Sequence, residues 1–133
     1  MIFSVRFNNP EQFGEIDGQI RKLAQSKKSG QWSIQLEGGQ RRPPMVRTDQ
    51  AEHLWQVIES IATELDIRLR EEHRWSSADI CFADQRAALV DGFGPVGAKP
   101  PKKSEYILRH SLLERSTLLA MTLIRLHEGA LAR

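Results

Sequence analysis

The sequence has little cysteine and no long hydrophobic run. Its 133 residues include a single cysteine, Cys81, which cannot form an internal disulfide and is typical of a reducing compartment. The longest uncharged apolar stretch, residues 116–124, is far shorter than the roughly 20 residues that span a membrane. The start of the chain, MIFSVRFNNP, lacks the basic segment and apolar stretch of a signal peptide. These absences predict a soluble, cytoplasmic protein with no membrane segment.

The short motifs of common catalytic sites are also absent. There is no G-x-S-x-G nucleophile elbow, no phosphate-binding G-x-x-x-x-G-K and no H-E-x-x-H zinc motif. Cys81 and the scattered histidines do not have the spacing of a zinc site. The acidic residues of 49–72 could in principle hold a metal for a small nuclease, but a solvated helix face is the favoured interpretation. We therefore expect no enzymatic activity, no metal and no cofactor.

The length suits a single domain with one hydrophobic core. In the N-terminal part, residues 2–7 (IFSVRF) and 31–37 (QWSIQLE) alternate apolar and polar side chains, which predicts two half-buried strands. Between them, Asn9 and Pro10 are suited to the N-cap and first position of a helix. Residues 1–47 are thus expected to form a small β-α-β sheet unit with a basic loop.

The remaining part, residues 48–133, is expected to be mainly helical because its apolar residues recur at helical spacing. Asp49 and Ser111, each followed three residues later by glutamate, are predicted to cap two of the helices. The expected elements are helices over 50–66, 77–90 and 112–129 and a short strand over 106–108. The predicted fold class is therefore α+β, with the N-terminal β-α-β unit followed by a helical C-terminal part in one domain.

Basic residues gather in two blocks, one before and one well after the acidic stretch 49–72. Such blocks often serve only solubility, but their separation from the acidic stretch permits one basic face. The basic residues in question are Lys27, Lys28, Arg41, Arg42 and Arg47 in the first block and Lys99, Lys102, Lys103 and Arg109 in the second.

Two tryptophans are candidates for stacking on unpaired bases. Trp55 is expected at the edge of the buried face of its helix, and Trp75 follows Arg74 at a junction between a loop and a helix. Aromatic rings beside arginine and lysine bind single-stranded nucleic acid in this way. The alternative is that each ring is a half-buried core residue. Trp32, by contrast, is predicted to belong to the core.

Several short motifs, taken in order, resemble those of the phage NinB (Orf) family of recombination proteins. Arg47-Thr48 precedes Asp49-Gln50-x-x-x-Leu54-Trp55, which is similar to the family's D-Q-x-x-x-L-W stretch. Arg74-Trp75 and the segment 77–79 resemble the next family element. Arg109-His110-Ser111 resembles the start of the family's last segment, and His127-Glu128-Gly129 resembles its end. Ala51 and the prolines at 100–101 depart from the family pattern.

The resemblance implies a recombination mediator that has no nuclease or ATPase activity. Such proteins are homodimers, bind single-stranded DNA without strong sequence preference, contact the host single-strand-binding protein and assist recombinase loading. By the same resemblance, Gln50 and Trp55 would lie at the DNA-binding region, and Arg109 would match a basic residue before the terminal helix.

These observations predict a single-stranded DNA-binding protein. A homodimer is also expected, because the apolar residues of 112–126 occupy more than one face of their helix. The rival class is a protein-interaction module, such as a phage inhibitor or an immunity protein, which does not bind nucleic acid. The predicted DNA-binding residues are Arg41, Arg42, Arg47, Gln50, Trp55, Arg74, Trp75, Lys99, Lys102, Lys103 and Arg109.

Overall fold

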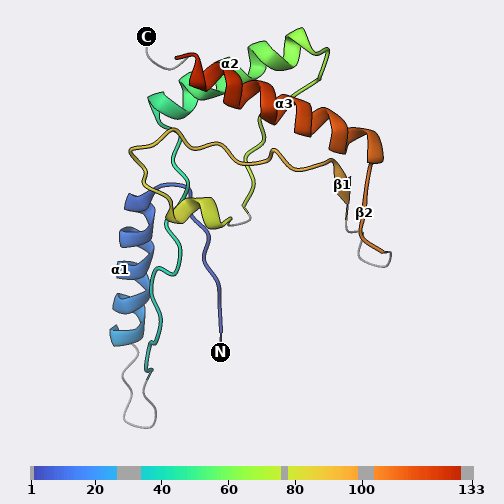
Figure 1. Ribbon diagram of the computed structural model, residues 1–133. Coiled ribbons are helices and arrows are strands. Elements are labelled where there is room, and N and C mark those ends of the chain that lie inside the picture. The colour runs from blue at the N-terminus through green and yellow to red at the C-terminus, as the bar shows by residue number, and fades with distance from the viewer. Residues whose placement is uncertain (1, 27–33, 76–77, 99–103, 130–133) are drawn as a thin grey trace. The chain divides into compact units, whose positions relative to one another are not determined.

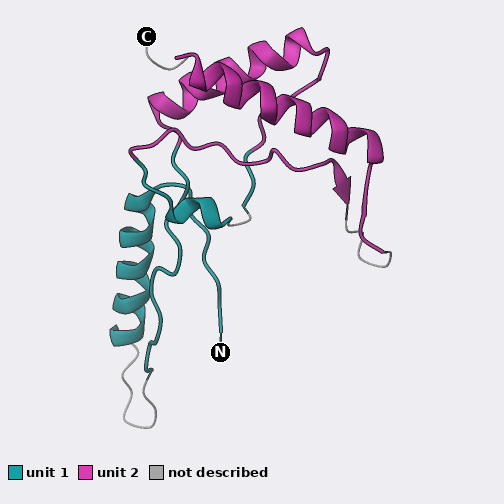
Figure 2. Ribbon diagram, in the orientation of Figure 1, with its two compact units in different colours: residues 1–46, 73–85 teal, residues 47–72, 86–133 magenta. Residues whose placement is uncertain are grey.

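The computed structural model describes residues 2–26, 34–75, 78–98 and 104–129, and these are mainly helical. The elements are helices α1 (Pro10–Ser26), α2 (Asp49–Glu64) and α3 (Arg109–His127), a 3₁₀ helix η1 (Asp79–Phe82), and strands β1 (Gly97–Ala98) and β2 (Tyr106–Ile107) (Figure 1). They belong to two compact units, 1–46 with 73–85 and 47–72 with 86–133 (Figure 2). Each unit combines two stretches that are distant in the sequence.

The second unit is built on the packing of α2 against α3. Ile58 and Ile61 from α2 and Leu118 from α3 are almost completely buried, and they form the centre of one hydrophobic cluster. The buried residues of α2 recur three or four positions apart, which places them on one side of the helix. This confirms the helix that apolar spacing predicts over 50–66.

The ends of α2 follow from local hydrogen bonds. Thr48, and not Asp49, is the N-cap, because the Thr48 Oγ1 accepts a hydrogen bond from the Ala51 N–H at 3.1 Å. At the other end, Asp66 adopts the left-handed conformation (φ 53°), and the N–H of Ile67 donates to the Ala62 carbonyl at 2.8 Å. This Schellman-type arrangement stops the helix and turns Ile67 back onto the core cluster.

A pair of short antiparallel strands precedes α3. β1 and β2 pair antiparallel, with Gly97 opposite Ile107, which confirms a strand within 106–108. A Cβ atom at Gly97 would collide with the Tyr106 carbonyl oxygen, so glycine is required there. Ser111 is not the helix cap: it lies buried in the first turn of α3, where its hydroxyl donates to the Leu108 carbonyl and accepts from the Val96 N–H. It thereby ties the hairpin to the helix.

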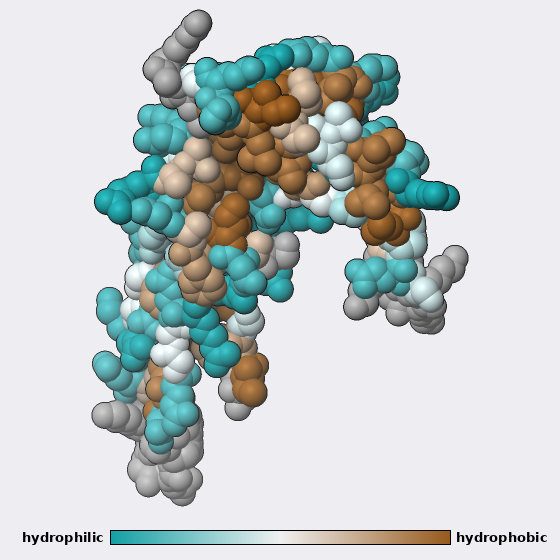
Figure 3. Space-filling view, in the orientation of Figure 1, coloured by the Kyte–Doolittle hydropathy of each residue, from teal (hydrophilic) through white to brown (hydrophobic). Residues whose placement is uncertain are grey.

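Much of the apolar surface of α3 stays exposed. In the space-filling view, hydrophobic residues gather along this helix (Figure 3). Its buried positions, Ser111, Leu118 and Thr122, lie on one side. The exposed apolar side chains, which lie away from that side by helical periodicity, are Leu112, Leu113, Leu119, Leu123 and Ile124.

The first unit contains α1, which begins where the sequence predicts. The Asn9 Oδ1 accepts a hydrogen bond from the Glu11 N–H at 2.8 Å, and Pro10 occupies the first helical position. The Phe7 ring lies 5.4 Å from that of Phe13, centroid to centroid. This contact fixes the direction from which the chain enters the helix.

The predicted N-terminal β-α-β unit is wrong. Residues 2–7 and 34–37 are extended but pair with no strand among the described residues, and the first regular element is α1. Residues 31–33, including Trp32, lie outside the described part. Alternation indicates an extended chain with one apolar side. Of these sides, Phe7 contacts Phe13 of α1 and Leu36 lines a hollow beside that helix, whereas Phe3 and Val5 are exposed. A fold class of helices with one small hairpin replaces the predicted α+β class.

The helix predicted over 77–90 is also wrong: the described residues of this segment contain only η1. Ala83 is extended, and the side-chain amide of Gln85 donates to the carbonyls of Cys81 and Ala83. The side chain thus satisfies acceptors that would bond to backbone N–H groups in a longer helix.

Adjacent leucines of α3 test the core assignment. Leu118 is 1 % exposed and Leu119 is 41 % exposed. We expect Leu118→Ala to lower the free energy of unfolding by about 2–5 kcal/mol, because it removes buried methyl groups and leaves a cavity. Leu119→Ala serves as the control and should cost less than about 1 kcal/mol in urea unfolding at dilute protein concentration. Equal losses in the two variants would refute the described packing of α3.

Candidate nucleic-acid interface

Arg42 lies between a carboxylate and an aromatic ring in the first unit. Its Nη1 donates to the Asp79 Oδ1 at 2.7 Å, and its guanidinium carbon lies 5.3 Å from the centroid of the Phe82 ring. Asp79 and Phe82 are three residues apart in a 3₁₀ helix, where side chains at that spacing eclipse one another. Both therefore reach the same guanidinium.

The Trp75 ring of the same unit is exposed to solvent. It is 54 % exposed, and the His73 ring meets it edge to face at 4.9 Å. The Arg6 Nη1 donates to the backbone carbonyl of Trp75 at 2.6 Å. The chain therefore holds the backbone at Trp75 in place while the indole stays open to solvent.

Arg41 and Arg74 complete the predicted residues of the first unit, and both are exposed. This unit thus contains four of the predicted DNA-binding residues, namely Arg41, Arg42, Arg74 and Trp75.

Arg47, in the second unit, is held by two carboxylates. Its Nε donates to the Glu52 Oε2 at 2.7 Å, and its Nη1 lies 2.9 Å from the Glu71 Oε1. The hydrogen bonds to Glu52 and then Glu71 raise the pKa of the guanidinium above its ordinary value. A DNA phosphate would have to compete with both carboxylates for this arginine.

Trp55 packs against the core cluster of the second unit and is half-buried. Gln50 is exposed in the first turn of α2, and Arg109 is exposed at the first position of α3. Lys99, Lys102 and Lys103 lie outside the described residues.

Sequence reasoning missed three residues that accompany the predicted ones: Phe82, His73 and Arg6. The available signal for Phe82 was its three-residue spacing from Asp79. Side chains three residues apart lie on the same side of an α-helix as well, so the predicted helix already placed Asp79 and Phe82 together. The sequence did not indicate that Arg42, from a distant part of the chain, contacts both of them.

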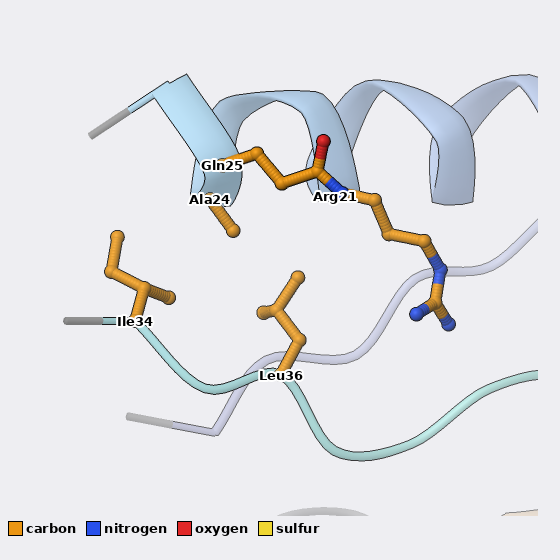
Figure 4. A pocket seen from close by; sticks show the side chains of 5 residues that line it. All are labelled: Arg21, Ala24, Gln25, Ile34 and Leu36. Carbon is orange, nitrogen blue, oxygen red and sulfur yellow. The ribbon is translucent and has the colours of Figure 1, made fainter. Parts of the chain in front are cut away.

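A shallow hollow of about 200 Å³ lies between α1 and the extended segment that follows it. Figure 4 shows Ala24 and Gln25 of the helix across from Ile34 and Leu36, with Arg21 alongside. Arg21 is itself paired with Asp17 one turn earlier. The lining contains no nucleophile and no titratable acid, so we assign the hollow no chemistry.

In the described part of the chain, no group of three or more His, Cys, Asp or Glu residues could hold a metal ion. No helix among those residues is long and apolar enough to cross a membrane. No family model, curated protein or solved structure matches this chain.

The two tryptophans should differ in their contribution to stability. Trp55→Ala removes a ring that packs on the core and should lower the free energy of unfolding by about 2–4 kcal/mol, toward the lower end of aromatic truncations because the ring is only half-buried. Trp75→Ala should change it by less than about 1 kcal/mol, since an exposed ring loses little packing. Thermal melts of the two variants measure this difference, and a larger loss for Trp75→Ala would contradict it.

Proposed function

We propose that this protein binds single-stranded DNA without strong sequence preference and acts as a recombination accessory protein rather than an enzyme. The observation that carries the proposal is the exposed Trp75 ring in a unit that also presents Arg41 and Arg42. Aromatic rings stack on unpaired bases of any sequence, and arginine side chains meet the phosphates between them. The two kinds of group are the minimum that such binding requires.

An exposed tryptophan is unusual because burial of the large ring stabilises a fold. The Arg6 hydrogen bond and the edge contact with His73 limit the movement of the segment that bears it. A ring held in place loses little conformational entropy when a base stacks on it. This supports a binding role for Trp75.

The recombination role rests on the resemblance to the NinB family. Arg74-Trp75 is one of the motifs that carry this resemblance, and it coincides with the exposed ring. The same resemblance supports a contact with the host single-strand-binding protein and assistance to recombinase loading. It also assigns Gln50, Trp55 and Arg109 to the DNA-binding surface.

We propose in addition that the protein is a homodimer that associates through the outer side of α3. Leu112, Leu119 and Leu123 form an exposed row with the small residue Ser116 between them. Their spacing alternates between four and three residues, as in helices that pack side by side with a second helix. A second copy of α3 presents the same row and is therefore the partner we assign.

The alternative function is a protein-interaction module such as an inhibitor or an immunity protein. The observation that favours it is this same exposed row on α3, which a different protein could cover. The two functions are separated by direct measurement of DNA binding, since the module has no affinity for nucleic acid.

We expect the purified protein to bind a fluorescently labelled oligothymidylate in roughly 50 mM salt and to lose affinity steeply as salt rises, because each neutralised phosphate releases counterions. Trp75→Ala should weaken binding by about 1–3 kcal/mol with an unchanged salt slope. Anisotropy titrations at several salt concentrations provide both values. Absence of binding by the wild-type protein at low salt would reject DNA binding in favour of the interaction module.

Light scattering tests the dimer. At micromolar concentration the wild-type protein should have twice the mass of the 15.2 kDa chain. The double variant Leu119→Lys, Leu123→Lys should be monomeric, because two charges in the interface would lose water without gaining partners. Leu23→Lys, an exposed leucine of α1, is the matched control and should remain dimeric. A wild-type mass of one chain would contradict the assignment.

A further inference from the structure

Phe82 is an exposed aromatic residue to which sequence reasoning gave no role. It is 60 % exposed, more than Phe3, Trp75 or Tyr106. It lies at the end of η1, directly after the buried Cys81. The turn is thus anchored on its inner side while it presents a phenyl ring to solvent.

The turn that bears Phe82 is held by several contacts. The Cys81 side chain is buried, and the Gln85 amide bonds to the carbonyls of Cys81 and Ala83 on either side of the phenylalanine. The Arg42 guanidinium lies over the ring, and Asp79 holds that guanidinium from one turn earlier. The ring and the cation are therefore arranged before any ligand arrives.

We propose that Phe82 and Arg42 form a nucleotide-binding pair, in which a base of single-stranded DNA stacks on the face of the phenyl ring that Arg42 does not cover and Arg42 contacts the neighbouring phosphate. This inference rests on the proposed DNA-binding function and assigns it a specific site. A guanidinium has five N–H donors, and the bond to Asp79 uses one of them. The remaining donors suit a phosphate, whose geometry a guanidinium matches.

Asp79 has a second effect in this arrangement. Its side chain is 89 % exposed, and an ion pair so open to water is weak and easily exchanged. The carboxylate therefore holds Arg42 in place over the ring but competes with the phosphate for it. Removal of the Asp79 charge should strengthen DNA binding, whereas a purely structural ion pair would have no such effect.

The experiment compares four variants by anisotropy with labelled oligothymidylate, each with a thermal melt to show that the variant is folded. Phe82→Leu keeps an apolar side chain but loses the aromatic face, and it should weaken binding about 5- to 100-fold with an unchanged salt slope. Phe82→Trp should restore wild-type affinity. Arg42→Gln should reduce the salt slope by about one unit. Asp79→Asn should tighten binding several-fold.

Phe3→Leu is the matched control, because Phe3 is an exposed aromatic residue of the same unit. It should bind as the wild type does. If the wild-type protein binds and Phe82→Leu binds equally well, or if Phe3→Leu weakens binding to the same extent, the pair is overturned while the proposed function stands. Weaker or unchanged binding by Asp79→Asn overturns the phosphate contact of Arg42. If the wild-type protein does not bind at all, both proposals fail.

Discussion

The contact between α2 and α3 is the constraint on which the second unit depends. Ile61 and Ile58 meet Leu118 there, and these are the most completely buried large apolar side chains of the described chain. Two local features fix the ends of these helices. The turn at Asp66 ends α2, and the Ser111 hydroxyl bonds the hairpin to the start of α3. A small core of this kind leaves apolar surface uncovered, which is the physical reason to expect a second copy along α3.

Two of the predicted DNA-binding arginines are paired with carboxylates, which weakens the contacts that they can make with phosphates. Arg42 bonds to Asp79, and Arg47 bonds to Glu52 and Glu71. With a net charge of only +2, the protein has no large positive field to attract DNA from a distance. A phosphate that contacts Arg42 or Arg47 competes with these carboxylates, so we expect them to weaken the electrostatic part of the affinity and stacking to add to it.

The sequence predicted helices better than strands, for a physical reason. Apolar spacing along 50–66 and 112–129 identifies a buried helix side by itself, and α2 and α3 confirm it. Alternation along 2–7 identifies only an extended chain, because a strand also needs a hydrogen-bonding neighbour that the pattern does not reveal. The sequence indicated Trp75 as a possible stacking residue because Arg74 precedes it directly. It did not indicate Phe82, because the cation beside that ring, Arg42, comes from a distant part of the sequence.

The central claim is that the first unit, through its exposed rings and arginines, is the part of the protein that contacts single-stranded DNA. Hydrogen exchange of backbone amides with and without oligothymidylate tests it most directly, because bound DNA slows exchange where it covers the chain. The account predicts added protection in residues 40–46, 73–75 and 78–85. Protection confined to α2 and α3, with none in residues 78–85, would contradict it.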